Sequence, residues 1–361
     1  MARQRVDASS DRMTGSSLVT GGAGFIGSHL VEQLLAAGDS VTVLDDFSSG
    51  SRDNLAAAAR LGDLRIVEGS VLDRAAIETA MRGSRRVFHL AVQCVRRSLG
   101  KPVENHDVNA TGTLLVLEEA RRQRIDRFVY CSSSEVYGNC GDERLSEEAS
   151  KCKPVTVYGA AKLAGEYYTS AYHQTYGLSA MVVRPFNSYG PREHSQGDLA
   201  EVIPRFVVRV LNGHPPVIFG DGANGRDFTY VGDTARGIAL AAEAELLIGR
   251  TVNIAYGTML TIRDVARSVA RLCGRPDLEP LFIEPRPGDV AVLQADTSLA
   301  RQLIGYTAEI DFEEGLRRYI DWFRDRHPDP AILFEKEVRN WRLPGEEDRA
   351  SMAKTPRGEA A

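Results

Sequence analysis

The sequence predicts an α/β fold built on a doubly wound parallel sheet. The first half of the chain alternates short apolar runs with amphipathic helical patterns, and longer loops rich in Gly and Pro follow Pro185. This alternation indicates right-handed βαβ units, in which helices cover both faces of a parallel sheet. The expected strands are residues 17–20, 40–44, 64–67, 86–89, 127–131 and 179–184, and the main expected helices are 24–37, 103–122 and 157–176.

A glycine-rich turn follows the first expected strand and begins the first expected helix. Residues 20–27 read Thr-Gly-Gly-Ala-Gly-Phe-Ile-Gly. Such glycines permit a tight turn, a close approach of backbone to a pyrophosphate, and close packing of helix on strand. The pyrophosphate would lie at the positive end of the helix dipole. We therefore expect a dinucleotide to contact the turn residues Gly21, Gly24, Phe25, Ile26 and Gly27.

Asp45 indicates which dinucleotide this is. It ends the second expected strand, where a carboxylate can accept hydrogen bonds from a ribose diol. A 2′-phosphate there would meet a like charge, so the sequence favours NAD over NADP. The alternative is that Asp45 is a solvated acid of the turn.

The positions of loops rich in Gly and Pro indicate two domains, and the composition excludes several classes of protein. We expect residues 1–15 as a disordered tail and 16–185 as an NAD-binding Rossmann domain. A smaller mixed α/β substrate-binding region, 186–330, would partly return to the main domain, and the end of the extension 331–361 would be disordered. The net charge of -5 does not indicate the basic surface that binds nucleic acid. No apolar stretch suits a membrane span or a signal peptide, and five cysteines without metal-like spacing indicate a reducing cytoplasm and no metal site.

Tyr158 and Lys162 are the first candidate catalytic pair. Four residues apart, they share one face of a helix. A phenol has an ordinary pKa of about 10, which is too high for a base at neutral pH. We expect the Lys162 ammonium, helped by a bound nicotinium, to lower the pKa of Tyr158 and favour the phenolate. A pair at this spacing is also common in purely structural helices.

A run of serines supplies a second candidate. Residues 132–134 are all Ser, and they follow the strand at 127–131. Ligands of parallel sheets bind at the carboxyl ends of the strands, so a hydroxyl there can contact the substrate oxygen that Tyr158 deprotonates. The alternative is a capping turn, in which serine is common.

Jointly these motifs resemble the extended short-chain dehydrogenase/reductases, specifically the nucleotide-sugar epimerase/dehydratase group. The resemblance runs from about residue 17 to 324. It is carried by the motifs TGGAGFIG at 20–27, LDD at 44–46, HLA at 89–91, SSSEVYG at 132–138, Tyr158 with Lys162, RPFN at 184–187, YGPR at 189–192, RDFTYV at 226–231 and RPGD at 286–289.

The resemblance implies a role for each matching position. Ser133 is implied as the catalytic hydroxyl, Tyr158 as the base and Lys162 as its partner. The implied cofactor contacts add Ser70, Val71 and Leu90, although Ser70 replaces the usual acid. The implied substrate contacts are Ser133, Ser134, Asn187, Phe219 on the nucleobase, Arg226 and Arg286 on the diphosphate, and Asp289 on the ribose. Phe219 could instead belong to the core, and the two arginines to surface ion pairs.

The implied reaction begins with oxidation of the sugar at C4 and leaves three outcomes open. We expect 4-epimerisation of a UDP-hexose or UDP-uronic acid through a transient 4-keto sugar. Glu135 favours the alternatives, because 4,6-dehydratases and uronate decarboxylases of the group often carry a glutamate there. A non-catalytic NAD sensor is a remote alternative. The helices at 103–122 and 157–176 resemble those that pair as a four-helix bundle in the family's homodimer.

Overall fold

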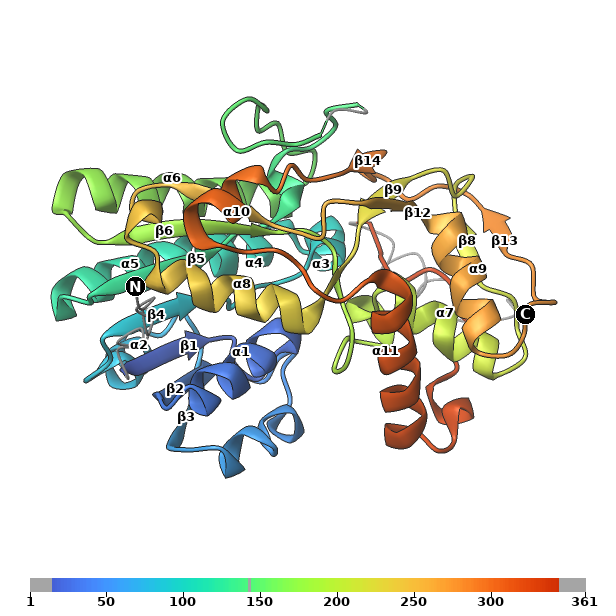
Figure 1. Cartoon of the computed structure of the whole chain (residues 1–361), viewed down its shortest axis with the longest axis horizontal. Helices are drawn as coiled ribbons and strands as arrows, with labels where there is room; N and C mark the ends of the chain where they lie inside the picture. Colours follow the sequence, from blue (N-terminus) through green and yellow to red (C-terminus); the bar gives the residue numbers. More distant parts are fainter. Residues whose placement is uncertain (1–14, 142–143, 344–361) are drawn as a thin grey trace, which may run out of the picture.

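A parallel sheet forms the larger half of the molecule (Figure 1). The computed structural model describes residues 15–141 and 144–343, and in these residues seven strands follow the order β11-β6-β5-β4-β1-β2-β3. The order 3-2-1-4-5-6 is that of dinucleotide-binding sheets, so the predicted doubly wound fold is confirmed. The strands are β1 Ser16–Thr20, β2 Ser40–Asp45, β3 Leu64–Glu68, β4 Arg86–His89, β5 Arg127–Cys131, β6 Ala180–Pro185 and β11 Thr251–Ile254.

Helices cover both faces of this sheet. One face carries α1 (Phe25–Ala36), α8 (Val231–Glu243) and α10 (Ser298–Ile304), and the other carries α2 (Arg74–Met81), α5 (Gly112–Gln123) and α6 (Val157–Tyr176). Successive strand residues point to opposite faces. Val19 therefore packs with α1 and α8, whereas the adjacent Leu18 packs with α2 and α5.

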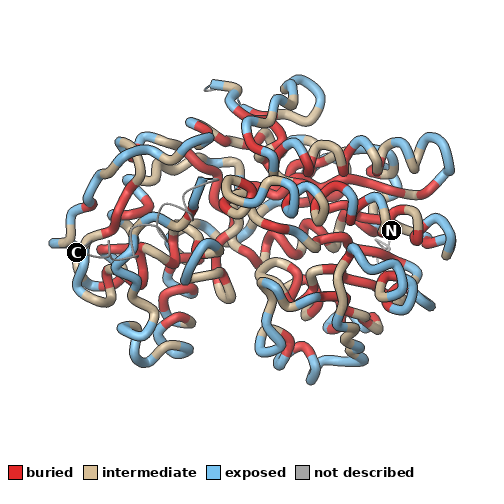
Figure 2. The backbone as a smooth tube through the Cα atoms, turned by 180° about the vertical axis from the view of Figure 1, so that it is seen from behind, coloured by how far each residue is buried: buried red, intermediate tan, exposed pale blue. Residues whose placement is uncertain are grey.

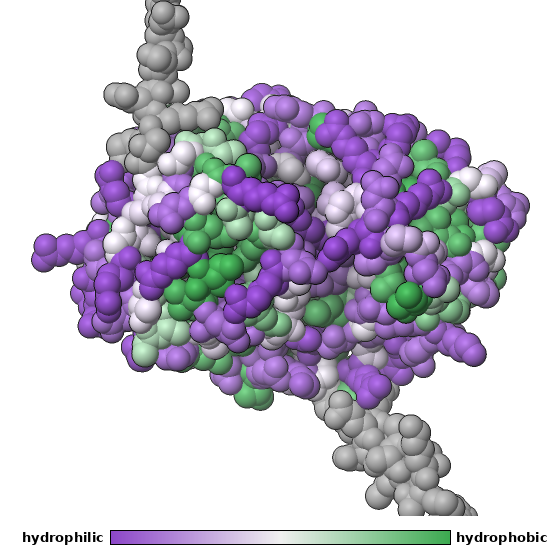
Figure 3. All heavy atoms as spheres, turned by 90° about the horizontal axis from the view of Figure 1, so that it is seen from below, coloured by the Kyte–Doolittle hydropathy of each residue, from purple (hydrophilic) through white to green (hydrophobic). Residues whose placement is uncertain are grey.

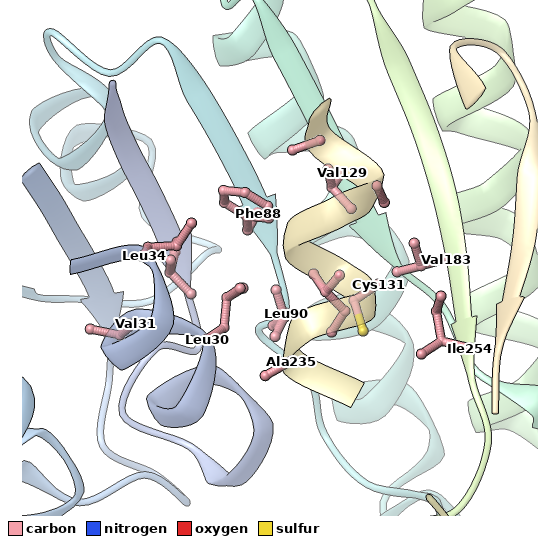
Figure 4. Packing of buried hydrophobic residues seen from close by; sticks show 14 of the residues in the cluster. Leu30, Val31, Leu34, Phe88, Leu90, Val129, Cys131, Val183, Ala235 and Ile254 are labelled. Carbon is pink, nitrogen blue, oxygen red and sulfur yellow. The ribbon is translucent and has the colours of Figure 1, made fainter. Parts of the chain in front are cut away.

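The first of these two cores joins the strands to α1 and α8 (Figure 4). Leu30 and Leu34 of α1 point toward Phe88 of β4, and Ala235 of α8 lies beside Leu90. All five side chains are less than 9% exposed. Burial of aliphatic and aromatic groups contributes about 1.5–3 kcal/mol for each large side chain, so this packing fixes the strand ends that carry the site.

The predicted helix at 103–122 is interrupted. It consists of α4 (Pro102–His106), a π-helical turn at Asp107–Thr111 and α5. A π-turn inserts one extra residue and frequently marks a functional site. Here the turn carries Asn109, whose amide binds both backbone groups of Gln93, with N–O distances of 2.9 Å. The interruption thus aims a polar side chain at the loop after β4, and hydrophobic periodicity alone does not reveal it.

The smaller domain lies beside the carboxyl edge of the sheet (Figure 1). Its core packs α7, α9 and α11 around side chains such as Phe206, Val269 and Tyr319. The chain returns to the main sheet through α8, β11 and α10, so the two domains share one continuous framework. The further elements are α3 Val95–Gly100, β7 Ser188–Tyr189, α7 Val202–Leu211, β8 Val217–Phe219, β9 Gly225–Asp227, β10 Thr229–Tyr230, β12 Met259–Thr261, α9 Ile262–Leu272, β13 Leu281–Ile283, β14 Val292–Leu293 and α11 Phe312–Arg326.

The buried backbone follows the strands, and exposed residues concentrate in loops and on outer helix faces (Figure 2). Seen from below, hydrophilic residues cover most of the surface, with smaller groups of hydrophobic residues between them (Figure 3). Within the described residues, no helix has the length and apolar character to cross a membrane.

Gly15, expected in the tail, hydrogen-bonds to Asp39 and Ser40 at the sheet edge, with both N–O distances 3.1 Å. The expected disordered ends otherwise lie at residues 1–14 and 344–361, outside the described residues.

Candidate active site

A cavity of about 310 Å³ opens at the carboxyl edge of the sheet. Four segments that follow strands meet there: the glycine turn after β1, the ends of β2 and β4, and the serine run after β5. The cavity also reaches the start of α6, the segment after β6, and the residues His194, Leu199 and Glu201. It thus extends from the glycine turn to the boundary with the smaller domain.

The glycine turn has the shape that a dinucleotide requires. Gly21 has a φ of +69°, and a Cβ there would lie 2.7 Å from the Ala91 nitrogen. A Cβ at Gly27 would overlap the Gly21 carbonyl oxygen. Helix α1 begins directly after Gly24, and its first backbone N–H groups face the cavity side of the turn. The predicted residues Gly21, Gly24, Phe25, Ile26 and Gly27 all line the cavity. A pyrophosphate fits this bare backbone because no side chain blocks it.

Asp45 lies at the end of β2 and lines the same cavity. Its two carboxylate oxygens accept hydrogen bonds from the backbone nitrogens of Ala23 and Phe47, each over 2.9 Å. Burial raises the pKa of Asp45, and these two backbone hydrogen bonds lower it. The carboxylate is therefore held in place, and its remaining lone pairs are available to ribose hydroxyls.

Of the three further positions expected to contact the cofactor, two line the cavity. Val71 and Leu90 do so, whereas Ser70 does not. The Ser70 hydroxyl instead accepts a hydrogen bond from the Leu72 nitrogen over 3.2 Å, which closes the turn after β3.

Ser133, Tyr158 and Lys162 meet in the cavity. Ser133 follows β5, while Tyr158 and Lys162 occupy the first turns of α6, and all three line the cavity. The Ser133 hydroxyl acts to lower the pKa of the Tyr158 phenol, so these side chains interact as one unit. Lys162 is only 2% exposed, and its Nζ lies 4.6 Å from the centroid of the Tyr130 ring.

The expected lowering of the Tyr158 pKa is wrong for the protein without its cofactor. Burial raises the pKa of Tyr158, and this effect exceeds the lowering by the Ser133 hydrogen bond. Burial also lowers the pKa of Lys162 to about 8, so its ammonium group loses a proton more readily than that of an exposed lysine. Desolvation disfavours both charged forms, so a phenolate needs additional positive charge in the cavity.

Glu135 is the free carboxylate beside the catalytic serine. It lines the cavity two residues after Ser133, and its backbone nitrogen donates to the Ser133 hydroxyl over 3.2 Å. Burial raises the pKa of Glu135, while Arg226 and Arg286 lower it. Glu135 thus lies within the electrostatic reach of the smaller domain's arginines and of the reactive hydroxyls.

The expected substrate residues form two groups. Ser134 and Asn187 line the cavity, and the Asn187 side-chain oxygen is buried without a hydrogen-bond partner among the described residues. Arg226 and Arg286 both donate to one oxygen of Asp289 over 2.8 Å, in the smaller domain. Phe219, at the end of β8, does not line the cavity; its ring packs against Trp341.

Sequence reasoning missed an ion pair that closes the cavity on the side of the smaller domain. Arg96 donates to both carboxylate oxygens of Glu201, over 2.9 and 2.7 Å, and also to the carbonyls of Asp198 and Leu199. Arg96 is 6% exposed, and both members of the pair line the cavity. One signal for Arg96 was present, because it follows β4 at the carboxyl edge where ligands bind. Its partner lies 105 positions away in the sequence.

Together, the sheet order, the glycine turn and the Ser133–Tyr158–Lys162 unit define an NAD-binding enzyme that oxidises or reduces an alcohol. Residues 17–255 match the NAD dependent epimerase/dehydratase family. The chain belongs to this family, and NAD is its cofactor.

Relatives of both named reactions are similarly close. The chain is 36% identical to a dTDP-glucose 4,6-dehydratase of Streptomyces niveus, over 85% of this chain and 92% of that protein. It is 35% identical to a UDP-glucose 4-epimerase of Mycolicibacterium smegmatis, over 86% and 99%. The solved structure of the dTDP-glucose 4,6-dehydratase DesIV from Streptomyces venezuelae, with NAD bound, has a TM-score of 0.83 at 33% identity, covering 88% of this chain and all of that one.

Proposed function

We propose that this protein is an NAD-dependent nucleotide-sugar 4-epimerase that acts through a transient 4-keto sugar on a UDP-hexose or UDP-uronic acid. The observation that carries the proposal is the position of Ser133, Tyr158 and Lys162 in the cavity that also contains the glycine turn. A sugar hydroxyl at this unit would lie beside the cofactor's redox-active end.

The chain's own residues prepare the sugar for oxidation. Tyr158 takes the proton of the C4 hydroxyl as general base, and the Ser133 hydroxyl, which lines the same cavity, binds the sugar oxygen. Lys162 stabilises the phenolate and binds the nicotinamide ribose. Gly21, Gly27 and Asp45 would hold NAD, which would supply a hydride acceptor for C4 and a positive charge that offsets the burial of the phenolate.

Asn187 and the arginines of the smaller domain account for the nucleotide half of the substrate. Asn187 lines the cavity, and its side-chain oxygen is buried without a hydrogen-bond partner among the described residues. Arg226 and Arg286 together carry two positive charges, whereas Asp289 carries one negative charge. The excess positive charge suits a diphosphate, for which guanidinium groups have matching geometry.

The number and positions of the carboxylates that line the cavity favour epimerisation at C4 over elimination of water. The acidic residues that line it are Asp45, Asp46, Glu135 and Glu201. Asp45 and Asp46 lie at the glycine-turn end, and Arg96 holds Glu201. Glu135 is then the one carboxylate of the described cavity that can exchange protons beside Ser133. Elimination of water across C5 and C6 must both remove a carbon-bound proton and protonate the leaving hydroxyl, whereas inversion at C4 needs neither step.

Glu135 nevertheless supports a second candidate reaction. Burial raises its pKa, which favours the protonated carboxyl group that a general acid needs. The alternatives are therefore a 4,6-dehydratase or a UDP-glucuronate decarboxylase, in which Glu135 would act after C4 oxidation. A non-catalytic sensor is disfavoured, because such a protein has no need of the Tyr158–Lys162 pair or of Arg226 and Arg286, and this chain has all four residues.

The proposal is tested by incubating the purified protein with UDP-, dTDP- and GDP-hexoses and uronic acids. Mass spectrometry and NMR of the products distinguish the reactions. A product of unchanged mass with inverted C4 supports the epimerase, loss of water indicates the dehydratase, and loss of carbon dioxide indicates the decarboxylase. No conversion of any of these sugars would contradict all three.

We also propose a homodimer formed through α4, α5 and α6. Val103, Leu114 and Tyr167 are 72%, 36% and 68% exposed on these helices. Helix α6 packs against both α4 and α5, so these exposed apolar side chains lie on adjacent helices. Two such faces would bury their apolar groups as a four-helix bundle around a two-fold axis.

A further inference from the structure

Residues 335–343, here called the C-terminal strap, lie against residues 197–205 at the boundary of the cavity. The Glu335 carboxylate accepts from the Gly197 nitrogen over 3.0 Å, and the Asn340 amide donates to the Ala200 carbonyl over 2.9 Å. The Val338 carbonyl accepts from the Arg205 guanidinium. These contacts attach the strap to the segment that includes Leu199 and Glu201, which line the cavity.

The strap places Trp341 against Phe219. The ring centroids lie 4.6 Å apart at an interplanar angle of 73°, so the rings form a corner instead of a stack. A flat ring that stacks on one wall of such a corner presents its edge to the other wall. Trp341 is only 6% exposed.

Trp341 also has a buried donor that nothing in the described chain satisfies. Its indole Nε1 has no hydrogen-bond partner there, although the indole N–H can only donate. A buried donor without an acceptor costs about 1–3 kcal/mol. A ligand that brings an acceptor to this corner would recover that free energy.

Arginine side chains lie between this corner and the rest of the site. The Arg205 guanidinium carbon lies 5.6 Å from the centroid of the Phe219 ring. Arg286 lowers the pKa of both Arg205 and Glu135, so it lies within electrostatic reach of the corner and of the catalytic end. Through Arg205 and the strap's hydrogen bonds to Gly197 and Ala200, the corner adjoins the segment whose Leu199 and Glu201 line the cavity.

We propose that the C-terminal strap completes the nucleobase subsite, and that the Trp341 indole N–H donates to a carbonyl oxygen of the base. This inference rests on the proposed nucleotide-sugar substrate and adds a specificity-determining residue to it. Uracil, thymine and guanine carry such an oxygen, whereas adenine does not. The strap therefore selects against adenine nucleotides at the substrate site.

Binding of nucleoside diphosphates to the NAD-saturated enzyme tests this proposal, since NAD then fills its own site. By calorimetry, UDP or dTDP should bind the wild type at least tenfold more tightly than ADP. Trp341→Phe keeps an aromatic ring against Phe219 but removes the donor, so it should weaken UDP binding about tenfold, roughly 1.4 kcal/mol, and leave ADP binding unchanged. Trp322→Phe, in helix α11, is the matched control and should leave UDP affinity unchanged.

Fluorescence provides a second readout. In Trp322→Phe, Trp341 is the remaining tryptophan, and its emission should change saturably with UDP at the calorimetric Kd. UDP affinity in Trp341→Phe within threefold of wild type would overturn the proposal, and tighter binding would show that the strap obstructs the subsite. If no nucleoside diphosphate binds the wild type, both this inference and the proposed function fail. If UDP binds without involving Trp341, only the inference fails.

Discussion

Arg184 and Glu166 form a doubly hydrogen-bonded ion pair next to the serine run at 132–134. The guanidinium donates to both carboxylate oxygens, over 2.9 and 2.6 Å, and the Ser132 hydroxyl donates to the same carboxylate. The two side chains are 6% and 7% exposed. The pair links β6 to α6 and so holds the serine run against the helix that carries Tyr158.

Removal of the Glu166 carboxylate should therefore destabilise the fold. Glu166→Leu leaves a buried guanidinium without its counter-charge, for which we expect a loss of about 3–5 kcal/mol in the free energy of unfolding. Asp126→Asn is the control, because it breaks the exposed pair of Asp126 with Arg85 and should cost less than about 1 kcal/mol. Urea denaturation measures both variants. Equal, small losses would show that the buried pair does not support the site.

Tyr158→Phe should fold, retain NAD and lose activity by about 10²–10⁴-fold, because it lacks the general base. The wild-type kcat/KM should rise with pH as the phenol loses its proton, since burial raises the pKa of Tyr158. That rising limb should be absent from the residual activity of the variant. Tyr176→Phe, which removes an exposed phenol oxygen from the end of the same helix, should behave as wild type. Near-normal turnover of Tyr158→Phe would remove this residue from the mechanism.

Glu135→Gln separates the proposed epimerase from the alternatives. The amide keeps the shape of the side chain but cannot take a proton. For an epimerase we expect activity within about tenfold of wild type, roughly 1.4 kcal/mol of barrier. A loss on the order of 10²-fold or more, with the 4-keto sugar accumulating in product analysis, would place Glu135 in a step after oxidation. The protein would then be a dehydratase or decarboxylase.

Tyr167→Glu should disrupt the proposed dimer, because it places charge in the apolar face of α6. Light scattering should show a dimer for the wild type at micromolar concentration and a monomer for the variant. Ile332→Glu is the control: this side chain is 76% exposed in the smaller domain, and its variant should remain dimeric. A monomeric wild type would exclude the four-helix arrangement.

The sequence predicted most of the sheet because its strands are short apolar runs with clear breaks. The strands 86–89 and 127–131 and the helix 157–176 have the predicted bounds, and the other predicted strands differ by one or two residues. The π-helical turn at Asp107–Thr111 was not predictable, because it is seen in the backbone hydrogen-bond pattern, on which the sequence is silent. Periodicity reports which face is buried, not which hydrogen bonds form.

The predictable part of the site consists of residues close together in the sequence. Tyr158 and Lys162 share a helix face, and the glycine turn is contiguous. Contacts such as Arg96 with Glu201 and Trp341 with Phe219 join residues more than 100 positions apart, so they depend on the tertiary fold. Without the cofactor, burial raises the pKa of Tyr158, and the sequence does not reveal this because the burial of a phenol depends on everything that covers it.

The central claim is that a hydride leaves C4 of the sugar and returns to the same molecule within one turnover. A substrate deuterated at C4, chosen as the best converted sugar, tests this directly with enzyme that holds its own NAD. The account predicts that the isolated product keeps the deuterium at C4, with inverted configuration and no NADH released into solution. Loss of deuterium from the product together with one NADH released per turnover would contradict the account and identify a simple dehydrogenase.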